Sequence, residues 1–130
     1  MSNMFYSCPE LISANLSNLN TTKLTNMNCI FNNCTALTNL NISSMNTKNV
    51  EQMHLIFYDC KKLKNLDLSH FDIEKVKENG TIFYGSYHES SFKLPKAIKK
   101  GDIKIMYNGD EGNFFNEEFV KNNKKNIKII

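Results

Sequence analysis

The chain has 130 residues, of which 41% are hydrophobic, and its formal net charge at pH 7 is +3. This length normally makes one domain, and the hydrophobic fraction is enough to close a modest core. The excess charge lies in residues 79–130, where nine Lys face six acidic residues, while residues 1–52 and 53–78 are each neutral. Because binding to a phosphate backbone needs a much denser basic surface, we expect no nucleic-acid partner.

A 26-residue repeat runs through residues 1–78 without gaps. The most regular positions hold the same residue in successive units: Met1, Met27 and Met53; Phe5, Phe31, Phe57 and Phe83; Cys8, Cys34 and Cys60; Leu11, Leu37 and Leu63. Other apolar positions follow the same register: Ala14, Leu40 and Leu66; Leu16, Ile42 and Leu68; Leu19, Met45 and Phe71; Leu24, Val50 and Val76. One unit cannot bury its own apolar face, so we expect stacked units to share a continuous core.

Each unit contains two periodicities. Residues 37–43 alternate apolar and polar side chains over their second half, which is typical of a short strand with one buried face. Residues 50–60 place apolar side chains at helical spacing, with Glu51, Gln52 and His54 outside, and this predicts a helix. Asn46-Thr47 lies between the two segments, matched by Asn20-Thr21 and Asp72-Ile73, and supplies side-chain acceptors for the amides that open a helix.

The segment L-x-x-L-x-L-S, with M-x-x-(M/I)-F-x-x-C-x-x-L before it, closely resembles the BspA-like leucine-rich repeats over residues 1 to about 85. These are many-copy surface proteins of AT-rich bacteria and some protists. The resemblance implies adhesion or protein binding, with strands that line a concave side. It predicts an α/β fold, namely a short right-handed leucine-rich-repeat solenoid of three full repeats and a degenerate fourth, with a small α+β C-terminal cap.

Residues 1–94 are expected to form the repeat array, with units at 1–26, 27–52, 53–78 and a degenerate unit at 79–94. In the last unit Ser86 and Glu89 replace the repeated Cys and Leu, while Phe92 and Leu94 keep the strand register before Pro95. Residues 95–130 are predicted to be a cap with a strand at 102–107, a turn at 108–112, a short helix at 116–122 and a last strand within 121–130. The alternative is that this lysine-bearing segment supplies binding specificity.

The solvent-facing side chains of the predicted strands form columns across the units, and such a face is the usual recognition surface of a repeat protein. The predicted partner-binding residues on this concave face are Asn15, Asn39, Asn41, Ser43, Lys64, Asn65, Asp67 and Ser69. They are polar and nearly uncharged, which suits hydrogen bonding to a protein surface. The alternative is that Asn and Ser only solvate the sheet and that the Ser column is a turn feature. Tyr6, Tyr58 and Tyr84 form a further column that we expect to pack between units.

The four cysteines are expected to be free thiols. Cys8, Cys34 and Cys60 share an interior column and Cys29 lies outside it, with no C-x-x-C pair and with scattered His residues, so buried packing is favoured over metal ligation. Free thiols favour a reducing compartment. No phosphate-binding loop and no hydrolase or metalloprotease motif is present. We therefore expect no enzyme activity, no cofactor and no metal.

The sequence thus predicts a non-catalytic module that recognises a protein. Two settings stay open: adhesion at the cell surface if the chain is part of a longer protein, or a cytoplasmic inhibitor or regulator if Met1 is the native start. Neither a signal peptide nor a membrane span is expected. Because the first unit begins without a polar cap, Met1, Phe5 and Leu11 need a cover, so a homodimer through this end is a further possibility.

Overall fold

The computed structural model describes residues 1–63, 65–77, 91–93, 95, 103–105 and 127–129. Its strands are three residues long each: β1 Ser13–Asn15, β2 Asn39–Asn41, β3 Asn65–Asp67, β4 Ser91–Lys93, β5 Ile103–Ile105 and β6 Ile127–Ile129. β1 pairs with β2, β3 with β4 and β5 with β6, in each case in parallel.

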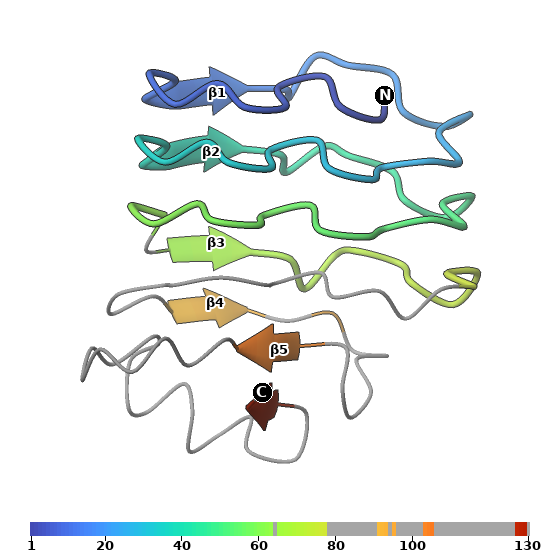
Figure 1. The fold of residues 1–130 in the computed structure, drawn as a ribbon. Helices are drawn as coiled ribbons and strands as arrows, with labels where there is room; N and C mark the ends of the chain where they lie inside the picture. The colour runs from blue at the N-terminus through green and yellow to red at the C-terminus, as the bar shows by residue number, and fades with distance from the viewer. Residues whose placement is uncertain (64, 78–90, 94, 96–102, 106–126, 130) are drawn as a thin grey trace.

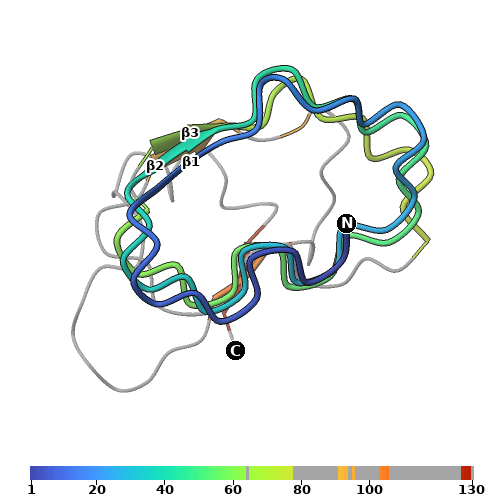
Figure 2. The same cartoon turned by 90° about the horizontal axis from the view of Figure 1, so that it is seen from above.

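The chain winds in stacked coils, which we name coil 1 (residues 1–26), coil 2 (27–52) and coil 3 (53–77). Strands β1 to β4 lie one above another along the stack (Figure 1), and from above the three coils follow nearly the same outline (Figure 2). Ser13 lies opposite Asn39 and Asn65 opposite Ser91, an offset of 26 residues in both sheets. The sequence repeat is therefore also the repeat of the backbone.

The interior of the stack consists of the repeated apolar columns. The rings of Phe5 and Phe31 stack with centroids 5.3 Å apart, and those of Phe31 and Phe57 with centroids 5.9 Å apart. Most other positions predicted to be interior are buried in coils 2 and 3: Met27 and Met53, Cys34 and Cys60, Leu37 and Leu63, Val50, Ile42 and Leu68. Leu40 and Val76 are only partly buried. In coil 1, Phe5, Cys8 and Leu11 are only partly buried, because no described coil covers their outer side.

The helix predicted at residues 50–60 is wrong. This segment is a series of turns, in which Leu55 and Asp59 have φ angles of 52° and 58°. The same positions have positive φ in the other coils: Asn3 and Ser7 in coil 1, and Cys29 and Asn33 in coil 2. A right-handed α-helix cannot continue through residues in the left-handed region, and strands are the only regular elements among the described residues.

Backbone amides in these turns alternate between two acceptors. The amides of Asn32 and Cys34 donate to carbonyls three residues earlier, at 3.2 Å each. The amide of Phe31, between them, donates instead to the carbonyl of Ile56 in coil 3, at 3.0 Å. Successive turns still bring every third or fourth side chain inward, so the apolar spacing matches that of a helix although the hydrogen bonds do not.

The predicted fold class is wrong for the same reason. Turns, not helices, connect the strands of the described coils, so no α/β leucine-rich-repeat solenoid is shown. No α+β cap is shown either, because the described part of residues 95–130 outside Pro95 is the parallel pair β5 and β6. These strands fall within the predicted strand ranges 102–107 and 121–130, whereas the predicted turn at 108–112 and helix at 116–122 lie outside the described residues.

Among the described residues, no helix has the length and apolar character needed to cross a bilayer.

Candidate functional site

The strand face is the outward side of β1 to β4, and one column on it holds Asn15, Asn41, Asp67 and Lys93, all exposed. Ser13 and Asn39 form an exposed neighbouring column in β1 and β2. The parallel register places Asn15 opposite Asn41 in one sheet and Asp67 opposite Lys93 in the other. Of the predicted binding residues, Lys64 lies outside the described residues, and Asn65 is placed by its backbone in β3.

Asx turns fix the side chains at the end of each strand. The side-chain oxygens of Asn15, Asn41 and Asp67 accept the amides two residues ahead at 3.0, 3.2 and 3.0 Å. The hydroxyls of Ser43 and Ser69 donate to the same oxygens, the first at 2.8 Å. The Ser43 and Ser69 hydroxyls are thus engaged in local turns, whereas the NH2 groups of the exposed Asn15 and Asn41 donate to no other described residue.

Next to the column of Ser13 and Asn39, coils 1 and 2 are linked by the side chain of Thr38. The Asn39 amide group donates to the Thr38 hydroxyl at 3.1 Å, and that hydroxyl donates to the Ile12 carbonyl at 3.1 Å. The amide of Thr38 bonds the same carbonyl at 2.9 Å. Asn39 is therefore held by a chain of bonds that starts on the backbone of coil 1.

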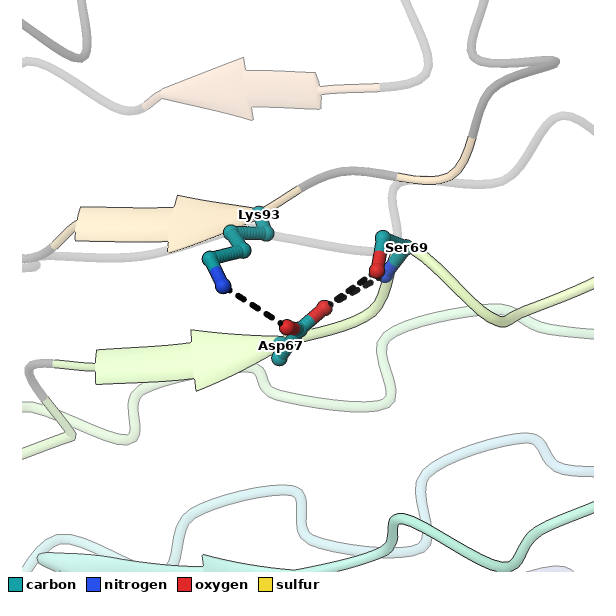
Figure 3. A network of polar contacts seen from close by, with 3 residues as sticks. All are labelled: Asp67, Ser69 and Lys93. Atoms are coloured by element: carbon teal, nitrogen blue, oxygen red, sulfur yellow. Dashed lines mark hydrogen bonds and ion pairs between the residues drawn. The ribbon is translucent and has the colours of Figure 1, made fainter.

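Asp67 is the charged centre of the strand face (Figure 3). It accepts the amide and the hydroxyl of Ser69, and Lys93 of β4 donates to its second oxygen at 3.0 Å. The Ser69 hydroxyl and amide, and then the Lys93 ammonium, hold the pKa of the Asp67 carboxyl well below its usual value. Both side chains of the ion pair are half exposed or more, so solvent screens it.

Lys93 was missed as a site residue from the sequence. The repeat pattern of the fourth unit decays, so only Phe92 and Leu94 are recognisable as inward positions. Lys93 lies between them. The signal that could have found it is the repeat itself, because Lys93 stands 26 residues after Asp67 and β4 keeps that register. Asp67 and Lys93 thus occupy the positions in β3 and β4 that Asn15 and Asn41 occupy in β1 and β2.

Two of the four free cysteines are buried thiols of low reactivity. Cys34 and Cys60 are buried, and their thiols donate to the carbonyls of Phe5 and Phe31 at 3.1 and 3.0 Å. Burial raises the pKa of both thiols, which keeps them protonated and poorly nucleophilic. Within the described ranges, no three His, Cys, Asp or Glu side chains lie close enough to share a metal ion.

The expected packing of the tyrosine column between units is wrong for its first member. Tyr6 is 55% exposed, whereas Asn32 at the equivalent position of coil 2 is buried. Tyr58 is partly buried in coil 3, and Tyr84 lies outside the described residues. The exposed Tyr6 belongs instead to the end of the stack.

Comparison with known proteins places the chain in one family. The family model described as Mycoplasma protein of unknown function, DUF285, matches residues 1–116, which include all three coils and β1 to β5. None of the curated proteins and none of the solved structures matches the chain. Because the match spans most of the sequence, this repeat protein belongs to the family described as Mycoplasma protein of unknown function, DUF285.

Proposed function

We propose that the chain is a non-catalytic binding module that recognises a protein through the strand face. The observation that carries this proposal is a set of outward polar groups held at regular spacing: the amide groups of Asn15 and Asn41, and the pair Asp67 and Lys93. Asx turns fix the side-chain oxygens, so little side-chain freedom remains to be lost on binding.

The chemistry of this face favours a protein partner over an ionic one. Its Asn side chains donate and accept hydrogen bonds without carrying charge, and its described charges, Asp67 and Lys93, are paired with each other at 3.0 Å. Neighbouring strands lie about 4.8 Å apart, so the column presents a row of groups that matches the polar surface of a folded protein.

A matched pair of double variants tests the proposal. In Asn15→Asp with Asn41→Asp, the turn oxygens remain, as Asp67 shows at the same position, but each outward amide donor becomes a carboxylate oxygen. The control is Asn20→Asp with Asn46→Asp, which makes the same change at the Asx turns that accept the amides of Thr22 and Lys48 on another side of the coils.

The partner is first captured from cells on the immobilised chain, identified, and purified for titration. We expect the strand-face variant to bind at least about tenfold more weakly, since a lost donor and an unpaired carboxylate each cost roughly 1–3 kcal/mol at an interface. The control variant should bind like the parent chain. Equal affinities of the two variants, at equal thermal stability, would show that the strand face is not the binding surface.

The biological setting within this proposal is open between two possibilities. The resemblance of the repeat spacing to BspA-like repeats supports adhesion at a cell surface, and the free thiols of the described cysteines support an intracellular inhibitor or regulator. Fractionation of source cells, with detection by an antibody to the chain, distinguishes the two settings.

Self-association through coil 1 remains a prediction. The mass of the protein in solution at working concentration tests it.

A further inference from the structure

The acceptor oxygens of one strand-face column are largely used within the chain. In Asn15, Asn41 and Asp67 a side-chain oxygen accepts the amide two residues ahead, at 3.0, 3.2 and 3.0 Å. In the last two the serine hydroxyl two residues ahead donates to the same oxygen. The second Asp67 oxygen accepts the Lys93 ammonium group at 3.0 Å. Most of the accepting capacity of this column is therefore engaged before any partner arrives.

The hydrogen-bond donors of the same column are available to a partner. Asn15 and Asn41 are exposed, and their NH2 groups donate to no other described residue. The Lys93 ammonium group bonds Asp67 and has further N–H donors, which bond no other described residue. We call Asn15, Asn41 and Lys93 the donor column. A partner that meets it must supply acceptors.

The neighbouring column of the strand face does not share this character. The NH2 group of Asn39 donates to the Thr38 hydroxyl at 3.1 Å and is therefore engaged within the chain. The available donors thus belong to the column whose oxygens are held in Asx turns, and not to every polar residue of the strand face.

A carboxylate is the acceptor that fits the donor column best. Ionised Asp and Glu side chains only accept hydrogen bonds, and their two oxygens can take bonds from different donors. Asn15 lies opposite Asn41 on the neighbouring strand, about 4.8 Å away, so one carboxylate can accept from both NH2 groups. Hydrogen bonds to an ionised acceptor are also stronger than those to a neutral carbonyl.

The charges of the chain favour the same partner. The Lys93 side chain is 76% exposed and gives the donor column a positive charge. The adjacent Asp67 carboxylate is already compensated by Ser69 and Lys93 (Figure 3), so it opposes an acidic partner only weakly. The whole chain carries a formal charge of +3, which attracts an acidic partner over a longer range.

We propose that the donor column binds an acidic segment of a partner protein, whose Asp or Glu carboxylates accept from Asn15 and Asn41 and pair with Lys93. This inference rests on the proposed binding function of the strand face and specifies the chemistry of the partner.

The probe is a fluorescent hexaglutamate peptide, titrated with the full chain by fluorescence anisotropy at low salt. Six extended residues span about 20 Å, whereas the donor column spans about 14 Å over its three strand spacings. The matched peptide is hexaglutamine, which has the same side-chain length and an acceptor oxygen but no charge. We expect saturable binding of hexaglutamate, at least about tenfold tighter than that of hexaglutamine.

Two lysine variants of equal net charge locate the binding. Lys93→Gln removes the ammonium group and leaves the Asp67 carboxylate without its ion pair, so hexaglutamate should bind at least about fivefold more weakly. The matched control is Lys75→Gln, at an exposed lysine that bonds the Asn49 side chain at 2.8 Å outside the strand face. This variant should bind within about twofold of the parent chain.

Absence of saturable hexaglutamate binding, equal affinity for both peptides, or equal weakening in both lysine variants would overturn the acidic partner. Failure of this inference is distinguishable from failure of the binding function. If Asn15→Asp with Asn41→Asp loses the captured partner although hexaglutamate does not bind, the strand face binds a partner of different chemistry.

Discussion

At the residue scale, buried threonines connect the coils in a way that side-chain patterns do not reveal. The Thr47 hydroxyl accepts the Asp72 amide at 2.7 Å and donates to the Asp72 carbonyl at 3.0 Å, and Thr21 makes the same pair of bonds to Asn46. From the sequence, Asn46-Thr47 is expected to cap a helix. The Asn46 side chain does accept an amide, that of Lys48, but it does so in a turn while Thr47 points into the stack.

Replacing Thr47 by Val is expected to lower the free energy of unfolding by about 1–3 kcal/mol, because the part-buried Asp72 amide and carbonyl lose their partner while the side-chain volume is kept. Urea denaturation measures the change. Thr25→Val, at an exposed position, is the control and should stay within about 0.5 kcal/mol of the parent. A loss no larger in Thr47→Val than in Thr25→Val would show that the hydroxyl does not hold the coils together.

Asp67 should make stability depend on pH. Its pKa is lowered in the folded chain by Ser69 and Lys93, so its stabilising effect is fully present above the ordinary carboxyl pKa of 3.8 and is lost as pH falls through the lower folded value. In Asp67→Asn the turn acceptor remains and the titrating group is absent. We expect the melting temperatures of the two proteins to converge as pH falls below about 4.

Melting curves from pH 7 to pH 2 at low salt measure this convergence, and added salt should shrink the difference at pH 7 because the pair is exposed. A constant difference in melting temperature over the whole range would show that the Asp67 carboxylate contributes nothing through its charge.

At the element scale, the short strands could be predicted from the sequence and the turns could not. Alternation around Leu40 locates β2, and its equivalents locate β1 and β3. In residues 50–60 the apolar spacing is the same for a helix as for successive turns, so periodicity cannot distinguish them. The distinguishing feature is the left-handed backbone at Leu55 and Asp59, where neither residue is a glycine that would have revealed it.

A glycine substitution distinguishes a left-handed turn from a helix, because it changes the free energy of unfolding in opposite directions in the two. At Asp59, where φ is 58°, glycine relieves backbone strain, and Asp59→Gly should raise the free energy of unfolding by roughly 0.5–1 kcal/mol. In a helix the same change would lower it by about as much. Lys62→Gly, at a turn residue outside the positive-φ positions, is the control and should be destabilising. A destabilised Asp59→Gly variant would contradict the left-handed turn.

At the scale of the whole molecule, the repeat length, the interior columns and the outward polar columns follow from the sequence, because the same register governs every coil. The ion pair of Asp67 with Lys93 does not, because it depends on a fourth unit whose own pattern is weak. It lies on the strand face, where we propose contact with another protein.

The account depends on coils joined by backbone bonds across the stack, with no helix between the strands of the described coils. Scalar coupling through hydrogen bonds in the NMR spectrum of the isotope-labelled chain tests this directly. We expect a coupling from the amide nitrogen of Phe31 to the carbonyl carbon of Ile56, whose oxygen it bonds at 3.0 Å. A coupling from Phe31 to the carbonyl of Met27, four residues earlier, would show a helix and contradict the account.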